Sequence, residues 1–196
     1  DSVLSFIQSD LVFASQNLPD MPPAPGRVSK AAAYQLLAEV DNDLGQYANA
    51  VTAASWIINN PNYHLMTQRF GVDASKPGDV FSDLFKDGSQ NSPQNTEAIW
   101  VMQYQTGLPG FSGSGASGGN DNLRAFGPFY SQLPGFALPP NGADSLGRGV
   151  GWERPTPYSL YTIWSGPLET NDMRNSPYNI RRTWYYNLVG SPLYGQ

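Results

Sequence analysis

The stretch between residues 30 and 61, KAAAYQLLAEVDNDLGQYANAVTAASWIINNP, decides how this chain is expected to fold. Alanines crowd its first part, Leu44 and Gly45 interrupt it, and Pro61 ends it. Because small side chains let two helices approach closely, the stretch predicts an antiparallel helix pair that turns at Gly45. The second helix carries its packing face at spacings of three and four residues: Tyr47, Ala50, Ala54 and Ile57.

The predicted pair resembles the tetratricopeptide repeat, a motif of two antiparallel helices. Two positions depart from that pattern, because Asp41 stands where an aromatic residue is expected and Pro61 comes one residue early. A helical hairpin without repeat character is the alternative. The matching positions are Tyr34, Leu37 and Ala38 in the first helix, and Leu44, Gly45, Tyr47 and Ala50 in the turn and the second helix.

Another amphipathic helix is predicted before this pair, over residues 2–18. Pro19 and the segment MPPAPG (21–26) end it, and Ser29 is a suitable N-cap for the next helix. We interpret it as the second helix of a preceding repeat. One and a half repeats cannot bury both of their faces, so either the remaining chain covers them or the chain is a piece of a longer protein. The apolar face is formed by Leu4, Ile7, Leu11, Ala14 and Leu18.

The two halves of the chain differ in composition, since five of the 20 glycines fall in residues 1–100 and fifteen in residues 101–196. A short helix is predicted at 79–86, and alternating side chains predict a strand at 97–104. We therefore expect a mostly α fold with a few short strands, in one region covering residues 1–196. Repeat-like helices would occupy residues 1–62, and a loop-rich, aromatic-rich part would occupy residues 63–196.

The composition excludes several classes of function. With a formal net charge of -5 and only 14% charged residues, the chain lacks the clustered Lys and Arg that nucleic acid requires. It has no cysteine, which excludes a disulfide scaffold, a thiol nucleophile and a zinc-thiolate site. No apolar run approaches the roughly 20 residues that a membrane-spanning helix needs.

Several segments, in a fixed order along nearly all of the 196 residues, resemble the SusD/RagB family of outer-membrane nutrient-binding lipoproteins. The specificity comes from the ordered set rather than from any one motif. Asp172 and Arg174 occupy the positions of the family's Asp-x-Arg segment. The segments are DLVFASQNLP (10–19), GRVSKAAAYQLLAEV (26–40), LGQYANAVTAA (44–54), DLF (83–85), NTEAIWVMQY (95–104), GWERPTPYSLYTIW (151–164) and NDMRNSPYNIRRTWYYN (171–187).

This resemblance implies a helical-repeat platform at the surface of the bacterial outer membrane. Such a protein captures glycans, and sometimes peptides, for a SusC-like TonB-dependent transporter, and it binds without catalysing a reaction. Family members are longer and associate with the membrane through a lipidated N-terminal cysteine. The chain is therefore expected to be an internal fragment that lacks this lipidated N-terminus, and no cofactor is expected.

Sugars present apolar C–H faces and polar rims, so aromatic rings cover the faces while amide, carboxylate or guanidinium groups bond the hydroxyls. The Gly- and Pro-rich half of the chain holds both kinds of side chain. Trp152 belongs to an aromatic group for which packing is the favoured alternative, but it is the member expected to reach outward, because glycines precede it in GVGWERP (149–155). For Phe126, Phe129 and Tyr130, packing is an equal alternative. The predicted ligand contacts are Phe126, Phe129, Tyr130, Trp152, Asn120, Asn122 and Arg124.

Other aromatic residues are expected to pack inside the fold. Tyr158, Tyr161 and Trp164 recur every three residues, as on one face of a helix, and large rings in loops are more often buried than exposed. This spacing favours a role in the core. Asp172 and Arg174 are interpreted as a structural ion pair or turn.

Catalytic sites are disfavoured. A glycosidase needs two carboxylates about 5–10 Å apart, and Glu153, Glu169 and Asp172 are candidates only because they are acidic. His64, the one histidine, follows a helix-ending proline, and no G-x-S-x-G motif is present. The segment GSGASGG (113–119) lacks the G-K-[ST] of a phosphate loop, and the acidic residues lack EF-hand spacing.

The sequence thus predicts non-catalytic capture of an oligosaccharide for import. One alternative is a protein-interaction module that docks on the transporter without binding sugar itself. A less favoured alternative is an accessory domain of a glycoside hydrolase.

Overall fold

The computed structural model describes residues 2–103, 125–138, 141–142, 149–167 and 169–196. The chain divides into two compact units, a first unit Asp1–Gln103 and a second unit Tyr104–Gln196. The predicted boundary at residue 62, between the repeat-like helices and the loop-rich part, lies inside the first unit, which also contains the irregular residues that follow the helices. The described part is mostly helical, in agreement with the predicted fold class.

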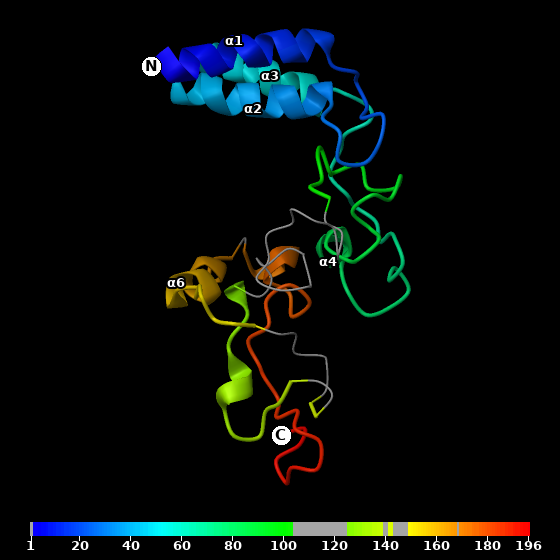
Figure 1. Cartoon of the computed structure of the whole chain (residues 1–196), viewed down its shortest axis with the longest axis vertical. Coiled ribbons are helices and arrows are strands. Elements are labelled where there is room, and N and C mark those ends of the chain that lie inside the picture. Colours follow the sequence, from blue (N-terminus) through cyan, green and yellow to red (C-terminus); the bar gives the residue numbers. More distant parts are fainter. Residues whose placement is uncertain (1, 104–124, 139–140, 143–148, 168) are drawn as a thin grey trace, which may run out of the picture. The chain divides into compact units, whose positions relative to one another are not determined.

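Three helices of the first unit lie side by side in Figure 1: α1 (Ser2–Asn17), α2 (Lys30–Asp43) and α3 (Tyr47–Ile58). Helix α2 contacts both α1 and α3. All three helices predicted from the apolar spacing are confirmed. Gly45 has φ = +72° in the turn between α2 and α3, a conformation that side chains with a Cβ rarely adopt. Ser29 is at the N-cap position of α2, but its hydroxyl lies 3.4 Å from Tyr63 Oη and does not cap the helix.

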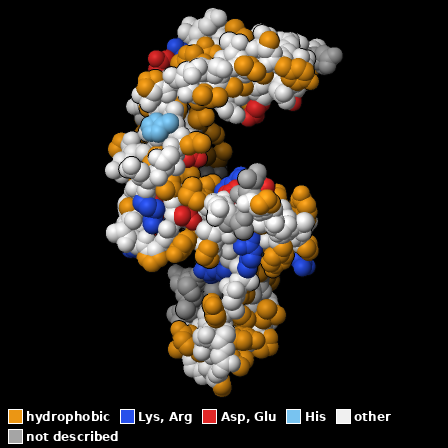
Figure 2. All heavy atoms as spheres, turned by 180° about the vertical axis from the view of Figure 1, so that it is seen from behind, with side chains coloured by type: hydrophobic (Ala, Val, Ile, Leu, Met, Phe, Trp, Pro, Cys, Tyr) orange, Lys and Arg blue, Asp and Glu red, His pale blue; other side chains and the backbone are white. Residues whose placement is uncertain are grey.

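Small and apolar side chains form the core between these helices. Tyr34 and Trp56 stack across the α2–α3 interface with ring centroids 4.7 Å apart. Apolar side chains also remain exposed on the outer faces of α1 and α3, and Figure 2 shows hydrophobic side chains over one face of this helical part. The buried core residues are Ala31, Ala33, Leu37, Val40, Ala53, Ile57 and Tyr63.

The predicted short helix at 79–86 is present as α4 (Val80–Leu84). Asp79 and Ser82 form a capping box, in which the Asp79 carboxylate accepts from Ser82 N and the Ser82 hydroxyl accepts from Asp79 N. These reciprocal bonds satisfy backbone donors that a one-turn helix would otherwise leave without partners.

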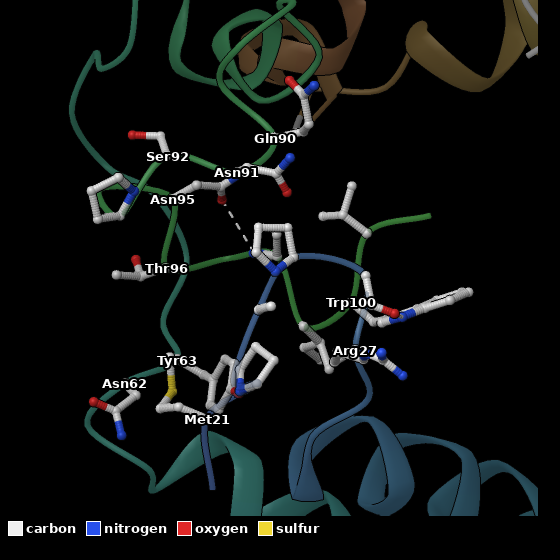
Figure 3. A pocket seen from close by; sticks show the side chains of 18 of the residues that line it. Met21, Arg27, Asn62, Tyr63, Gln90, Asn91, Ser92, Asn95, Thr96 and Trp100 are labelled. Atoms are coloured by element: carbon white, nitrogen blue, oxygen red, sulfur yellow. Dashed lines mark hydrogen bonds between the residues drawn. The ribbon is translucent and has the colours of Figure 1, made fainter. Parts of the chain in front are cut away.

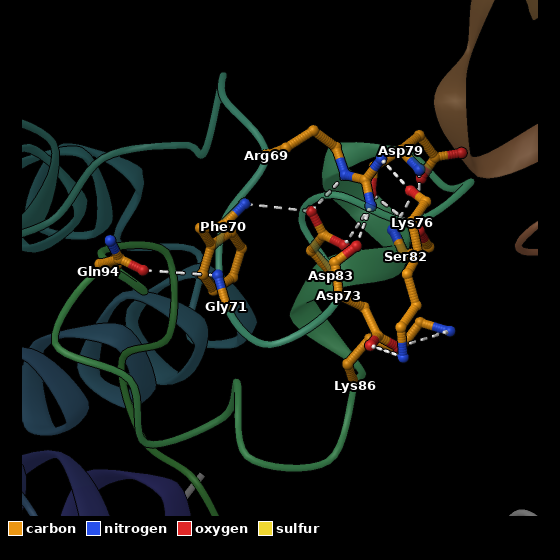
Figure 4. A network of polar contacts seen from close by, with 10 residues as sticks. All are labelled: Arg69, Phe70, Gly71, Asp73, Lys76, Asp79, Ser82, Asp83, Lys86 and Gln94. Atoms are coloured by element: carbon orange, nitrogen blue, oxygen red, sulfur yellow. Dashed lines mark hydrogen bonds and ion pairs between the residues drawn. The ribbon is translucent and has the colours of Figure 1, made fainter.

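A buried charge network fixes the loop around α4 (Figure 4). The Asp83 side chain is fully buried and accepts hydrogen bonds from the guanidinium of Arg69 and from Phe70 N. Arg69 also donates to the carbonyl oxygens of Asp73 (2.9 Å) and Lys76 (3.1 Å). One arginine therefore holds both ends of the segment from residue 69 to residue 83.

The predicted strand at 97–104 is wrong, because described residues 97–103 form no strand. Hydrogen bonds involving side chains hold this segment, and it is not part of a β-ladder. Ala98 N donates to Asn95 Oδ1 (3.2 Å), the Glu97 carboxylate accepts from Met66 N (2.9 Å), and Trp100 Nε1 donates to Gly26 O (3.1 Å). In the described residues the only β-pairing is an isolated bridge between Gly142 and Leu188, so the few short strands expected are not found there.

The described part of the second unit contains only short helices. Helix α6 (Pro157–Leu160) begins with a proline after Thr156, whose hydroxyl accepts from Ser159 N. None of the helices in the described ranges is long and apolar enough to cross a membrane. The 3₁₀ turns are η1 (Tyr130–Gln132), η3 (Thr162–Trp164), η4 (Glu169–Asn171) and η5 (Met173–Asn175).

Candidate functional site

The first unit contains a pocket of about 340 Å³ where three irregular segments meet (Figure 3). These are residues 21–27, which follow α1, residues 62–63, which follow α3, and residues 90–101. In Figure 3, Met21 and Tyr63 lie on the side nearest α2 and α3, and Gln90 and Asn91 lie on the opposite side. Two segments that follow helices and one longer loop therefore supply the walls.

Prolines and one glycine shape the first wall, residues 21–27. Arg27 N donates to Ala24 O (3.1 Å), which closes a turn at whose third position Gly26 has φ = +82°. The Gly26 carbonyl then accepts the indole N–H of Trp100, and Tyr63 Oη donates to Asp20 O (3.2 Å). These bonds join the proline-rich segment to the other two walls.

The third wall, residues 90–101, is attached to the segment that follows Tyr63. His64 N donates to Thr96 O (3.1 Å), and Thr96 Oγ1 donates back to His64 O (3.1 Å). At the outer end, Asn91 and Gln103 exchange two amide hydrogen bonds of 2.8 and 3.1 Å. The Asn91 amide is therefore oriented before any ligand arrives.

The pocket combines aromatic rings with neutral polar groups. Trp100 is 47% exposed to solvent, whereas Tyr63 is 7% exposed and supports the wall. Among the described residues that line the pocket, Arg27 is the one charged side chain, and no carboxylate or imidazole is present. The neutral polar side chains in the lining are Asn62, Gln90, Asn91, Ser92, Asn95 and Thr96.

This arrangement suits a ligand that is neutral and rich in hydroxyl groups. Amide groups can donate and accept, as a hydroxyl requires, and a ring can cover an apolar C–H face. Held side chains lose little conformational freedom on binding, which favours affinity.

The ligand contacts predicted in the second unit are partly exposed, partly outside the described residues and, in one case, buried. Phe126, Phe129 and Trp152 are exposed, and Trp152 is 71% exposed, as its glycine-rich context predicted. Two backbone hydrogen bonds, Gly151 N to Gly127 O and Glu153 N to Ala125 O, join the segments that carry Phe126 and Trp152. Asn120, Asn122 and Arg124 lie outside the described residues.

Tyr130 is buried and is not available as a surface ring. It is 3% exposed, and its ring lies 5.8 Å from that of Phe136 and 5.9 Å from that of Trp184, centroid to centroid. Tyr130 therefore packs in the core, the equal alternative to ligand contact, and the predicted ligand contact at this residue is wrong. A loop-rich unit needs such large side chains to form any core.

The packing expected of Tyr158 and Tyr161 is wrong, since both side chains are more than half exposed. Helix α6 is only one turn long, so a three-residue spacing does not make a buried face. Trp164 is half-buried, and its indole N–H donates to Ser159 O (2.8 Å). Exposed rings therefore extend along the surface of the second unit beyond the predicted contacts.

The ion pair predicted between Asp172 and Arg174 is confirmed. Arg174 Nε donates to both carboxylate oxygens of Asp172, at 2.9 and 3.0 Å, and Arg174 N donates to Oδ1. The side-chain hydrogen bond lowers the pKa of Asp172 and raises the pKa of Arg174. Asp172 also caps η5, so this pair is structural.

The sequence contained a signal for the pocket in the first unit that the strand prediction concealed. The segment NSPQN (91–95) is rich in amides and turn residues, and Trp100 follows it closely. Neutral polar side chains near a ring on a loop are also the features that the predicted contacts of the second unit share. Within the described residues, no group of three metal-binding side chains was found.

No protein-family model, no curated protein and no solved structure shows significant similarity to the chain.

Proposed function

We propose that this protein binds neutral oligosaccharides without catalysis, and that the pocket of the first unit is the site. The observation that carries the proposal is the combination of an open Trp100 ring with neutral amide and hydroxyl side chains in one pocket. Rings select the apolar faces of sugars, and amides match their hydroxyls. The exposed rings around Trp152 are a second place where a sugar could stack.

The resemblance to the SusD/RagB family supplies the setting of this proposal. In that setting, helices α2 and α3 form a tetratricopeptide-like repeat, and α1 is the second helix of a preceding one. The protein would act at the surface of the outer membrane and deliver its ligand to a SusC-like TonB-dependent transporter. The close packing of α2 against both α1 and α3 and the turn at Gly45 support the repeat.

One observation favours the alternative, docking on the transporter without binding sugar. A groove of about 530 Å³ runs between α1 and α2 next to Ile99 and Trp100, and its lining is mostly apolar. Apolar grooves of this kind mark protein interfaces as well as ligand sites. The residues of α1, α2 and the segment between them that line it include Leu11, Ala14, Leu18, Val28, Ala32 and Leu36.

The two functions can be separated by substitutions that touch one pocket only. The full chain is titrated with neutral α-glucan, β-glucan and β-mannan oligosaccharides while tryptophan fluorescence is recorded. Asn91→Ala removes an amide from the sugar pocket alone, and Leu36→Ser adds a polar group to the apolar groove alone. We expect Asn91→Ala to weaken sugar binding about fivefold, in line with one lost hydrogen bond.

Asn42→Ala is the matched control, since Asn42 is an exposed asparagine of α2 that lines neither pocket. It should bind sugar as the unchanged protein does. If no oligosaccharide of the three series binds, or if Asn91→Ala binds as well as the control, sugar capture in this pocket is excluded. Loss of binding to purified transporter in Leu36→Ser, with sugar binding absent from all variants, would support the docking alternative.

A further inference from the structure

A second hollow of about 520 Å³ lies at the end of α3, close to the sugar pocket. It is open and shallow, and polar side chains surround one half-buried ring, that of Trp56. Asp20 and the stretch Asn59–Pro61 complete its lining. This hollow lies entirely within the first unit and shares no residue with the pocket described above.

One face of α3 supplies the chemistry of this hollow. Thr52, Ser55, Trp56 and Asn59 follow one another at intervals of three, one and three residues, which places them together on the helix surface. The rest of α3 is almost entirely apolar or alanine. A solvated helix face is commonly polar, but a tryptophan centred among hydroxyl and amide side chains repeats the composition of the sugar pocket.

The Trp56 ring is held in place before a ligand binds. Tyr34 stacks on it at 4.7 Å with an interplanar angle of 23°, and the Lys30 ammonium lies 5.9 Å from its centroid. Lys30 is in turn paired with Asp20 at 2.9 Å, at the edge of the hollow. A ring fixed by these contacts offers its remaining surface without the entropy cost of ordering it.

The linings of the two hollows are neighbours along the chain at two places. Asp20 lines the second hollow and its neighbour Met21 lines the sugar pocket, and in the same way Pro61 and Asn62 line one each. Between them, Tyr63 Oη donates to Asp20 O (3.2 Å), which joins the two chain segments. A ligand long enough to pass over this Asp20–Tyr63 contact would therefore lie in both hollows.

We propose that the second hollow is a further subsite, and that the ligand is an extended oligosaccharide that passes from the Trp100 pocket over the Asp20–Tyr63 contact to Trp56. This inference rests on the proposed function and specifies its substrate class: a chain of several sugar units, recognised along its length. A monosaccharide or a disaccharide would fill one hollow only.

The test measures how affinity depends on chain length. The full protein is titrated with neutral α-glucan, β-glucan and β-mannan oligosaccharides of two to six units, by calorimetry. In the series that binds, affinity should rise about fivefold or more from the shortest to the longest member, as one or two added hydrogen bonds predict. The double variant Thr52→Ala, Asn59→Ala should bind the longest and the shortest member equally.

Each outcome bears on a different part of the proposal. Asn42→Ala should keep the full gain with length, and far-ultraviolet circular dichroism should show the same helix content in every variant. Binding without any gain with length, or a gain that survives in the double variant, overturns the second subsite and leaves the proposed function intact. Failure of all three series to bind overturns both.

Discussion

The two units satisfy their backbone hydrogen bonds by different means. In the first unit, helices α1, α2 and α3 pair most of their own amides and carbonyls. In the described part of the second unit, short turns pair the backbone locally, and polar side chains supply further bonds to it. Examples are the bonds of Asn187 to both backbone groups of Ala137, of Arg182 to Leu160 O, and of Asn179 to Met173 O.

This difference explains how aromatic residues are distributed between inside and outside. Helices bring small side chains together, so a core of alanines and aliphatic residues with one Tyr34–Trp56 stack is sufficient in the first unit. The second unit fills its interior with a chain of rings instead, and others remain exposed. We expect the unfolding free energy of the first unit to depend on the buried charge network around Asp83. That of the second unit should depend on side chains that bridge distant backbone segments, such as Asn187. The clustered rings are Tyr130, Phe136, Trp184 and Tyr186.

The largest effect is expected for Arg69→Ala in the first unit. It leaves the Asp83 carboxylate fully buried without its cation, and breaking a buried pair from one side costs about 3–5 kcal/mol of unfolding free energy. Urea unfolding followed by circular dichroism at the helix band measures it. Lys76→Ala, which removes an exposed partner of Asp73, should cost less than about 1 kcal/mol. Equal losses in both variants would show that the first unit does not depend on the buried pair.

The second unit should respond next most strongly, to Asn187→Ala. The Asn187 side chain is buried and accepts from Ala137 N and donates to Ala137 O, both at 2.9 Å. Its loss leaves two backbone groups without partners, for an expected cost of about 3 kcal/mol. Near-ultraviolet circular dichroism follows the ring cluster during urea unfolding. Asn141→Ala, an exposed asparagine in the same unit, is the control, and a similar loss there would contradict the bridging role.

The contrast between the units also explains what the sequence could predict. Apolar spacing at three and four residues predicted α1, α2 and α3, because a helix long enough to have a face is decided by local pattern. The bridge made by Asn187 joins residues 50 positions apart, and no local pattern contains that information. The pocket of the first unit was missed for the same reason, since residues 21–27, 62–63 and 90–101 meet only in three dimensions.

Local pattern misled the prediction where an element was too short. The alternation in 97–104 suggested a strand, but a strand needs a partner, and in the described residues 97–103 hydrogen bonds involving side chains hold the segment instead. Trp152 was placed correctly because its exposure follows from the glycines that precede it. Tyr158 and Tyr161 were misplaced because their spacing implied a helix longer than α6.

Glycines at positive φ provide an intermediate test of how closely each unit is packed. At Gly45 (φ +72°) an added Cβ meets nothing within 4 Å, so Gly45→Ala should cost only the backbone strain, about 1 kcal/mol. At Gly135 (φ +85°) the Cβ would lie 2.5 Å from Tyr186 Cδ1, and the ring cluster must move as well. Gly135→Ala should therefore cost about 2–3 kcal/mol by thermal unfolding. Equal shifts would mean that the ring cluster of the second unit is loosely packed.

The smallest expected effect is the loss of folding stability at low pH, through one carboxyl group in each unit. Hydrogen bonds from Lys76 and Arg174 lower the pKa of Asp73 in the first unit and of Asp172 in the second, below the usual value of 3.8. A carboxyl group whose pKa is lower in the folded state stabilises the fold above its unfolded pKa, and this contribution is lost as the pH falls through the folded pKa. Both cations are largely exposed and screened, so each unit should lose little stability as the pH falls below 3.8.

Titration of the two carboxyl groups by NMR, at low and high salt, measures these shifts directly. Asp73→Asn and Asp172→Asn should each weaken the pH dependence of the unfolding free energy of their own unit and leave that of the other unit unchanged.

The Asp172 pair also caps η5 through Arg174 N, whereas the Asp73 carboxylate binds only lysine side chains in the described contacts. Salt should therefore raise the pKa of Asp73 more fully toward its usual value than that of Asp172, because a backbone hydrogen bond is not screened as an ion pair is. An equal response to salt would mean that the cap contributes nothing beyond charge, and that in this respect the second unit is held together no differently from the first.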